Sequence, residues 1–386
     1  MQAQYLLAKI DRSAIIHNCR ILRSLTGKKC RLCAVVKCNA YGHGVDIVLP
    51  ALNEAGVDML AVAAIKEAEQ LKSMDCKFPI LLMGSEFSVY KDKVKKDIAN
   101  WLVANEIRIT PMNISDVEAL AFAAQHLEKK AVFHLLLDTG MSRMGLDEQN
   151  LLALITKIRS NEHIEIEGLY THFAAADEND KSFSNYQLQR FKSFVKYLKD
   201  DGLNIPILHA ANSAAAIDLP ESHFGMIRTG ISLYGYYPSG RIHNKPQLKP
   251  AMKVTSFLTA VKKIAAGSFI GYGCTYKATV DMVVGIVPIG YGDGYDRRLS
   301  NTGQMRVSGG LVPVVGRVSM DQTIVDLTGP TNSGLKVSAG AEVTVIDNVR
   351  QEPNSVESLA KLLDTIPYEI VTRLGPRIQR VPLLSS

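Results

Sequence analysis

The chain has 386 residues, of which 47% are hydrophobic and 21% are charged, a composition typical of folded globular proteins. Its formal charge of +6 is small and spread along the sequence, which argues against nucleic-acid binding and only weakly favours anionic small molecules. No apolar run approaches the roughly 20 residues needed to span a membrane, and the N-terminus lacks the apolar segment of a signal peptide. We therefore expect a cytoplasmic protein of about two domains, without a membrane partner.

Short apolar runs alternate with longer amphipathic ones from about residue 30 to 235. Eight such repeats, with strands that are apolar on both faces, predict a (β/α)8 barrel of the TIM type; a doubly wound sheet is the alternative. The predicted strands are CAVVK (33–37), MLAVAA (59–64), PILLMG (79–84), NWLVAN (100–105), AVFHLLLD (131–138), IEGLYTHF (166–173), IPILHA (205–210) and GMIRTG (225–230). The predicted helices are 65–74, 115–128, 148–159, 186–198 and 211–219, and the charged run 90–97 is expected to form a solvated helix face.

The pattern changes after residue 250, where β-rich runs are separated by Gly, Asn, Asp and Pro. These runs predict a mostly antiparallel β domain with one late helix at 355–363. We expect residues 11–240 to form the barrel, and residues 1–10 together with 241–386 to form the β domain. The Pro-containing stretch 238–250 is the expected linker.

Six cysteines in a chain of this length do not indicate a disulfide framework. Cys30 and Cys33 form a CxxC pattern that could be redox-active or half of a metal site. No second CxxC or histidine pair supports zinc, and no acidic cluster recurs that would hold a divalent cation. We therefore expect reduced thiols and no metal site.

Active-site residues of such barrels gather at the carboxyl ends of the strands. Lys37 stands on the last residue of its predicted strand, where a partly apolar pocket would lower the pKa of the amine and make it nucleophilic towards an aldehyde or ketone. Ser213, at a predicted helix start, and the backbone near Gly230 suit a phosphate. Together these features favour pyridoxal 5'-phosphate, although aldolase-type barrels use the same two parts and a lysine that merely extends from a strand end explains Lys37 equally well. The other polar residues at predicted strand ends are Asp138, Arg143, His172, His209, Asn212 and Arg228.

Nine segments, in order along both predicted domains, resemble the alanine racemase family of fold-type III pyridoxal-phosphate enzymes. They are AVVKCNAYGHG, DTGMSRMGL, THFAAADE, HAANSAA, IRTGISLYG, GYGCTYKA, PIGYGDGY, GRVSMDQTIVDLT and IPYEIVTRLGPR. The resemblance implies a homodimeric enzyme that interconverts L- and D-alanine with pyridoxal 5'-phosphate. A racemase that prefers serine or another amino acid, a fold-type III decarboxylase and a non-catalytic cofactor carrier are the alternatives.

The resemblance also implies a role for individual residues. Lys37 would hold the cofactor and serve as one of two catalytic bases, while Tyr272 would be the other and reach the barrel of a partner subunit. Arg228 would face the pyridine nitrogen, with His209 supporting it and His172 linking it to Tyr272. The residues that would hold the phosphate or pack on the cofactor are Tyr41, Ser213, Gly230, Ile231 and Tyr368.

The substrate would be held by Arg143 and the Met320 backbone, and Tyr291 and Asp321 would line the entrance from the partner side. One position departs from the family pattern. Many members carry a lysine two residues before the aspartate of DTGM, and that lysine is carbamylated and orients the arginine; here the residue is Leu136. We expect Arg143 to lack that partner, which casts doubt on alanine as the best substrate. His43 and His134 are expected to be structural.

Overall fold

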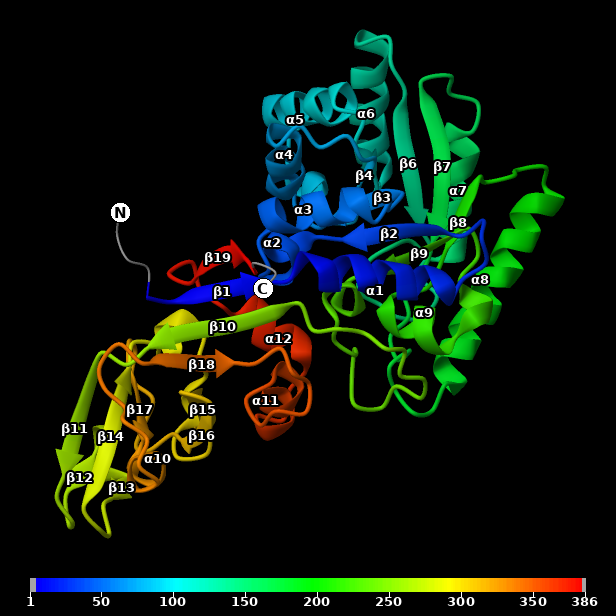
Figure 1. Ribbon diagram of the computed structural model, residues 1–386. Helices are drawn as coiled ribbons and strands as arrows, with labels where there is room; N and C mark the ends of the chain where they lie inside the picture. Colours follow the sequence, from blue (N-terminus) through cyan, green and yellow to red (C-terminus); the bar gives the residue numbers. More distant parts are fainter. Residues whose placement is uncertain (1–4, 384–386) are drawn as a thin grey trace.

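The computed structural model describes residues 5–383. Figure 1 shows a barrel of strands surrounded by helices, coloured blue to green, and a group of strands from the C-terminal third of the chain beside it. An eight-stranded parallel sheet forms the barrel, in the order β8-β7-β6-β5-β4-β3-β2-β9. The strands are β2 (Arg31–Val35), β3 (Met59–Val62), β4 (Ile80–Leu82), β5 (Arg108–Ile109), β6 (Ala131–Leu136), β7 (Ile164–Tyr170), β8 (Ile207–His209) and β9 (Met226–Thr229).

The two ends of this order also meet, which closes the barrel. Gly225 N donates to Leu208 O at 3.0 Å, and Arg228 N donates to Ala211 O at 2.9 Å. In β2, every residue from Leu32 to Val35 is buried, as a strand packed on both faces requires. The predicted (β/α)8 barrel is therefore confirmed.

Helices cover the outside of the barrel, and the five helices predicted for this part of the chain are present within a few residues of their expected ends. They are α4 (Ile65–Ser73), α6 (Ile114–His126), α7 (Glu148–Ile158), α8 (Ser182–Asp200) and α9 (Ser213–Asp218). The sequence pattern indicated only the first part of α5 (Asp92–Ala104), through the charged run 90–97. It did not single out α1 (Arg12–Ser24), α2 (Lys37–Tyr41), α3 (Val45–Glu54) or the short 3₁₀ turns η1 (Glu86–Val89), η2 (Pro220–Ser222) and η3 (Ile231–Tyr234). Asp11 caps α1 by accepting from Ala14 N at 3.0 Å.

The prediction of a strand at 100–105 is wrong. That segment is the end of α5, and the barrel strand that follows is the two-residue β5. Its apolar residues continue the helical spacing set earlier in α5, so that Ala99, Leu102 and Val103 face the core. The charged run 90–97 does begin this helix, but Lys95 within it is buried and pairs with Asp116 at 2.8 Å.

The C-terminal part is mostly antiparallel, as predicted. A six-stranded sheet has the order β16-β15-β18-β10-β1-β19, and smaller sheets have the orders β11-β14-β17 and β12-β13. Their strands are β1 (Leu7–Ile10), β10 (Met252–Phe257), β11 (Ala260–Ile264), β12 (Phe269–Ile270), β13 (Tyr276–Lys277), β14 (Met282–Val287), β15 (Gln304–Val307), β16 (Gly310–Pro313), β17 (Thr323–Asp326), β18 (Glu342–Ile346) and β19 (Gln379–Pro382). The helical elements are η4 (Tyr272–Cys274), η5 (Tyr291–Asp293), η6 (Arg297–Leu299), α10 (Thr328–Asn332), α11 (Val356–Leu362) and α12 (Pro367–Thr372).

Strand β1 precedes the barrel in sequence but pairs with β10 and β19 in the six-stranded sheet. This pairing agrees with an N-terminal segment that belongs to the β domain, of which residues 1–4 lie outside the described residues. The division of the chain at residue 240 stays a prediction.

A C-terminal segment reaches back to the end of β2. The ring of Tyr368, in α12, lies 5.9 Å from the ring of Tyr41. Gly42 has a φ of +78°, and a Cβ at this residue would lie 2.1 Å from Val371 O, so only glycine allows this approach of the two backbones. Arg380 Nε also donates to Gly42 O at 2.9 Å. The C-terminal segment thus braces the turn that carries Lys37.

Candidate active site

The turn that carries Lys37 differs from the expected strand end. Strand β2 ends at Val35, and Lys37 opens the short element α2, in which Cys38, Asn39 and Ala40 have left-handed φ and ψ angles near +50°. For non-glycine residues this conformation costs about 1 kcal/mol each, so it persists only where the surroundings enforce it. Strain of this kind is found frequently at functional sites.

Hydrogen bonds from three directions enforce the turn. Cys38 N donates to Glu67 Oε1 at 2.6 Å, and Val45 N donates to the Asn39 side chain at 2.8 Å. Ala40 N donates to Val36 O at 2.8 Å. Lys37 is half-buried and lines the cavity at the carboxyl ends of the barrel strands.

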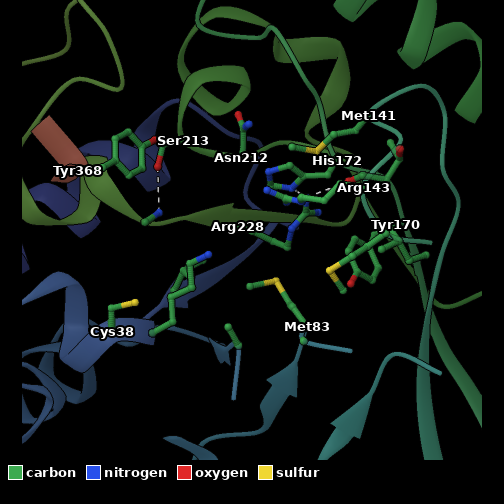
Figure 2. A pocket seen from close by; sticks show the side chains of 18 of the residues that line it. Cys38, Met83, Met141, Arg143, Tyr170, His172, Asn212, Ser213, Arg228 and Tyr368 are labelled. Atoms are coloured by element: carbon green, nitrogen blue, oxygen red, sulfur yellow. Dashed lines mark hydrogen bonds between the residues drawn. The ribbon is translucent and has the colours of Figure 1, made fainter. Parts of the chain in front are cut away.

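This cavity has a volume of about 410 Å³ and collects most of the predicted cofactor residues. Figure 2 shows Ser213 and Tyr368 near one end, Arg143 and Tyr170 near the other, and Arg228 and His172 between them. The predicted site residues that line it are Lys37, Tyr41, Arg143, His172, Ser213, Arg228, Gly230 and Tyr368.

Arg228 is buried at the centre of the cavity wall, and its guanidinium is held on several sides. Its Nη1 donates to His209 Nδ1 at 3.0 Å, and its Nη2 donates to Thr171 O at 2.9 Å and to His172 Nδ1 at 3.3 Å. Burial lowers the pKa of Arg228, but a guanidinium keeps its proton in proteins. The site therefore contains a fixed cation with a fixed orientation.

A chain of hydrogen bonds behind Arg228 determines which histidine nitrogens carry protons. His134 Nε2 lies 2.8 Å from Glu167 Oε2, and His134 Nδ1 lies 2.8 Å from His209 Nε2. A carboxylate can only accept, so His134 Nε2 must donate to it and His134 Nδ1 must accept from His209. His209 Nδ1 is then left without a proton and can accept from Arg228.

The charges along this chain agree with that assignment. Burial opposes ionisation of Glu167, but hydrogen bonds from His134 and Arg108 lower its pKa to about 2. Burial lowers the pKa of His209 well below its ordinary value, and the nearby Arg228 charge acts in the same direction. Glu167 is therefore ionised and His209 neutral near neutral pH.

His172 is the link between Arg228 and the open part of the cavity. Burial and the charge of Arg228 lower its pKa to about 3, so the ring is neutral. Because Nδ1 accepts from Arg228, the ring proton is on Nε2, where it can be donated to a further partner.

The opposite end of the cavity provides hydroxyl groups and one glycine. Ser213 Oγ accepts from Gly230 N at 2.9 Å, the contact drawn in Figure 2. A Cβ at Gly230 would lie 2.4 Å from the Tyr41 hydroxyl, so glycine leaves room for that group. Ile231 is buried directly after Gly230 at the start of η3. Burial raises the pKa of Tyr41 and of Tyr368, which keeps both phenols neutral.

The other predicted site residues do not line the cavity of the single chain. Tyr272, in η4, is 72% exposed, and Tyr291 and Met320 are 43% and 54% exposed. Asp321 follows Met320 and is also exposed. All four residues belong to the C-terminal part and are exposed, whereas His209 lies behind Arg228 rather than at the cavity surface.

Both parts of the chain match one protein family. The profile described as "Alanine racemase, N-terminal domain" matches residues 10–238, and the profile described as "Alanine racemase, C-terminal domain" matches residues 251–382. The chain belongs to the alanine racemase family. It is thus an enzyme of the racemase class, as the nine sequence segments indicated.

Individual members are similar over nearly the whole length. An alanine racemase of Methanococcus maripaludis is 41% identical over 97% of this chain and 98% of its own. The crystal structure of the alanine racemase of a D-cycloserine-producing Streptomyces lavendulae superposes with a TM-score of 0.90 at 31% identity, covering 100% of this chain and 99% of that one. The alanine racemase of Bartonella henselae, determined with covalently bound pyridoxal phosphate, has a TM-score of 0.83 at 31% identity and covers 98% of this chain and 99% of its own.

Leu136 lies where the family resemblance places a lysine. It is buried, lines the cavity and packs closely against Gly145, where a Cβ would lie 2.7 Å from Leu136 Cγ. A leucine offers no polar atom to Arg143, which stands exposed at the cavity rim. The expected loss of a partner for Arg143 thus agrees with the local environment.

Sequence reasoning missed some contributors. His134 was expected to be only structural, yet it joins Glu167 to His209. Side chains alternate between the two faces of a strand, so His134 points to the same face of β6 as Leu136, two residues later. This alternation could have indicated from the sequence that His134 points inward. His43 is buried with Nδ1 2.9 Å from Tyr41 O, which fits a structural role. The lining residues that the sequence did not single out as site residues include Cys38, Met83, Met141, Tyr170 and Thr372.

Within residues 5–383, no group of three or more His, Cys, Asp or Glu side chains is placed to hold a metal ion. The six cysteines are unpaired thiols, of which Cys38 and Cys274 are exposed. In the same described range, every helix is too short or too polar to cross a membrane.

Proposed function

We propose that the chain is a pyridoxal 5'-phosphate-dependent racemase that interconverts L- and D-alanine as a homodimer. The observation that carries the proposal is the position of Lys37, whose turn lines the same cavity as the fixed Arg228 cation and the Ser213–Gly230 pair. These groups match the three parts of the cofactor, namely its aldehyde, its ring nitrogen and its phosphate.

The residues of the cavity fit the cofactor chemically. Lys37 would bind the aldehyde carbon, and the hydroxyls of Ser213, Tyr41 and Tyr368, with the Gly230 and Ile231 backbone, would hold or pack against the phosphate end. The space that a Cβ at Gly230 would fill supports this assignment. When bound, pyridoxal 5'-phosphate supplies an electron sink that acidifies the proton on the amino acid Cα.

Arg228 would donate a hydrogen bond to the ring nitrogen without transferring its proton. The chain from Glu167 through His134 and His209 supports this role, because it presents a bare Nδ1 to Arg228 Nη1 and so keeps the guanidinium in place.

Racemisation needs one group on each face of the reacting carbon, because one removes the α-proton while the other returns a proton to the opposite face. Lys37 would act on one face and Tyr272 of the partner subunit on the other. The Nε2 proton of the neutral His172 would be donated to that tyrosine oxygen and would favour its deprotonated form. Arg143 and the Met320 backbone would bind the substrate carboxylate.

A homodimer is supported by what a single chain leaves exposed. Tyr272, Tyr291 and Met320 are open to solvent and do not line their own chain's cavity, although each lies in a motif shared with the family. A second copy would bring them to the cavity mouth. A cytoplasmic location stays a prediction from the sequence.

The deciding experiment is incubation of the purified, cofactor-loaded protein with L-alanine in deuterated water, followed by chiral chromatography and mass analysis. D-alanine with deuterium at Cα is expected. Unchanged alanine together with inverted serine or another amino acid would refute alanine as the substrate while leaving the mechanism intact. No inversion of any amino acid would refute the proposed function.

Two variants test the assigned residues. After borohydride reduction, we expect Lys37→Ala to carry no covalently attached cofactor. Lys66→Ala, at an exposed position on α4, should carry as much as the wild type. Tyr272→Phe should stop inversion but still exchange the α-proton of the one enantiomer that presents it to Lys37.

The shared site can be tested by mixing these two inactive variants. A heterodimer of Lys37→Ala and Tyr272→Phe subunits has one site in which both residues are intact, so activity should return after subunit exchange. No recovery in a mixture shown to contain heterodimers would contradict a site built from two chains.

A further inference from the structure

We propose that Arg377 is a positioning residue for the substrate entrance, which it forms by joining the two loops that carry Tyr291 and Met320. This inference rests on the proposed function. None of the roles considered above includes Arg377, which lies in the LGPR segment after α12 and is 48% exposed at its side chain.

Arg377 bridges two carboxylates from different loops. Its Nε lies 2.7 Å from Asp293 Oδ1, and its Nη1 donates to Asp321 Oδ1 at 2.6 Å. Asp293 is buried, and its second oxygen accepts from Gly290 N at 3.0 Å. One end of the bridge is therefore anchored in the core, and the other holds the exposed Asp321.

The backbones of the same two loops are also paired. Tyr291 N donates to Ser319 O at 3.0 Å, and Gly292 N donates to Met320 O at 2.9 Å. A Cβ at Gly292 would lie 2.8 Å from Arg377 Nη2, so the guanidinium lies directly against this backbone. Arg377 thus closes a unit in which Tyr291, Met320 and Asp321 have fixed relative positions.

The charges explain why this unit matters for binding. An amino acid substrate brings a carboxylate to the Met320 backbone, and Asp321 is the next residue. While Arg377 pairs with Asp321, the charge of the Asp321 carboxylate is neutralised and its side chain is turned towards the loop. Without Arg377, an unpaired negative charge would stand at the entrance and repel the substrate carboxylate. We therefore expect Arg377 to lower KM and to have little effect on kcat.

Arginine is suited to this position because its planar fork can contact both carboxylates at once. A lysine provides the charge but only one compact donor group. It can therefore pair with Asp321 or with Asp293, but it cannot contact both in the geometry that arginine allows. The KM of Arg377→Lys should accordingly lie between those of the wild type and of a variant without the charge.

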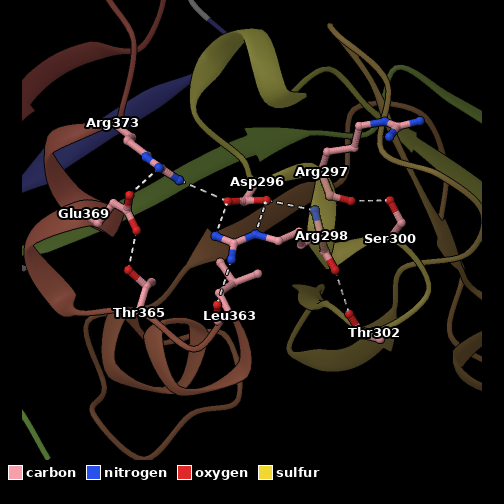
Figure 3. Close-up of polar contacts among 9 residues, drawn as sticks. All are labelled: Asp296, Arg297, Arg298, Ser300, Thr302, Leu363, Thr365, Glu369 and Arg373. Carbon is pink, nitrogen blue, oxygen red and sulfur yellow. Dashed lines mark hydrogen bonds and ion pairs between the residues drawn. The ribbon is translucent and has the colours of Figure 1, made fainter.

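The chain offers a matched control four residues earlier. Arg373 is 49% exposed and also contacts two carboxylates, Asp296 at 3.2 Å and Glu369. Figure 3 shows this second network, in which Asp296 also accepts from Arg298. It contains none of the residues assigned to the substrate.

The experiment compares steady-state racemisation by the cofactor-loaded wild type, Arg377→Met, Arg377→Lys and Arg373→Met. We expect KM for L-alanine to rise about tenfold in Arg377→Met and about threefold in Arg377→Lys, with kcat within about twofold of the wild type. Arg373→Met should leave KM unchanged.

A fourth variant separates positioning from stability. Arg377→Met leaves the buried Asp293 charge unpaired and could loosen the loop, so the double variant Asp293→Asn with Arg377→Met removes that charge. Its KM should stay raised about tenfold, because Asp321 remains unpaired.

An unchanged KM in Arg377→Met would overturn the inference, as would an equal change in Arg373→Met or a return to the wild-type KM in the double variant. Each of these outcomes leaves an active wild-type racemase and therefore leaves the proposed function standing. A wild type that inverts no amino acid would instead refute the proposed function, and the inference with it.

Discussion

Replacing Glu167 by glutamine tests the hydrogen-bond chain behind Arg228 with almost no change in shape. The carboxylate accepts from His134 Nε2 at 2.8 Å and from Arg108 Nε at 3.1 Å and Nη2 at 3.3 Å. His134 Nε2 and Arg108 Nε both donate to Oε2, whereas Oε1 accepts only from Arg108 Nη2. An amide has one accepting oxygen and one donating nitrogen, so it cannot accept at both positions. With its oxygen in the Oε2 position, the amide keeps the contacts with His134 Nε2 and Arg108 Nε and loses the one with Arg108 Nη2. In the flipped orientation it loses or reverses the contacts with His134 Nε2 and Arg108 Nε.

The pKa of Glu167 gives the size of the effect. Burial alone would raise it, but the hydrogen bonds from His134 and Arg108 lower it from 4.5 to about 2. At about 1.4 kcal/mol per pKa unit, these contacts favour the ionised form by about 3 kcal/mol. We therefore expect Glu167→Gln to lower the free energy of unfolding by about 2–3 kcal/mol at pH 7.

The flipped orientation would also change the proton positions. If the amide nitrogen faces His134, it donates to Nε2 and moves the ring proton to Nδ1. His134 then donates to His209, whose remaining proton must point at Arg228 Nη1, where two donors oppose each other. A lower kcat should therefore accompany a changed histidine tautomer, and an amide that is not flipped should leave both unchanged.

Urea unfolding and nitrogen NMR of labelled histidines measure the two effects separately. Glu178→Gln is the control, because Glu178 pairs with Arg241 at the surface, where such pairs contribute about 0–1 kcal/mol. A loss of less than about 0.5 kcal/mol in Glu167→Gln, with unchanged histidine tautomers, would refute the reasoning.

Three further predictions follow from the site. Gly230→Ala should weaken binding of pyridoxal 5'-phosphate at least about tenfold in an absorbance titration, because the added Cβ would meet the Tyr41 hydroxyl at 2.4 Å; unchanged binding would place the phosphate elsewhere. Leu136→Lys should lower the free energy of unfolding by about 2–4 kcal/mol in urea, because it places an ammonium group in a buried position. Bicarbonate should reverse part of this loss if the lysine is carbamylated. A variant as stable as the wild type would contradict the burial argument. Stability should fall as the pH drops from about 6.5 towards 4. Burial lowers the folded-state pKa of His43 to about 4 and of His172 to about 3, so the unfolded chain binds more protons in this range. Each histidine therefore lowers the free energy of unfolding by about 1.4 kcal/mol for each pH unit of acidification. A urea midpoint that stays constant from about pH 6.5 to 5 would be inconsistent with neutral buried rings.

The parts of the fold that were predictable depend on local periodicity. Alternating strands and amphipathic helices indicated the barrel, and most of the elements that were predicted begin and end within a few residues of their expected positions. The failure at 100–105 has a physical reason: Trp101, Leu102 and Val103 are apolar and strand-like by type, but they continue a helix whose buried side is set by packing on the barrel. The two-residue β5 has no sequence signal of its own.

The candidate site was predictable where a residue lies in a recognisable segment, and less so where its role depends on a neighbour from another strand. Lys37, Ser213 and Arg228 were found from their predicted strand ends. Alternation along β6 indicates that His134 points inward, but its partner Glu167 is set by the pairing of β6 with β7 and by a shift of register after Phe133. No single stretch of sequence reveals that partner. Arg377 was overlooked for the same reason, since Asp293 and Asp321 come from separate loops.

The sequence by itself determined the barrel, the β-rich C-terminal part and the family, because these follow from patterns along the chain. Only the tertiary structure decided that Lys37 lies in a left-handed turn rather than in a strand. It also decided that a carboxylate on the strand next to that of His209, acting through His134, dictates which nitrogen faces Arg228. The physical reason is that backbone strain and proton positions are set by contacts between distant segments. Glu67 and the C-terminal segment hold the turn, while Glu167 orders the protons of two buried rings.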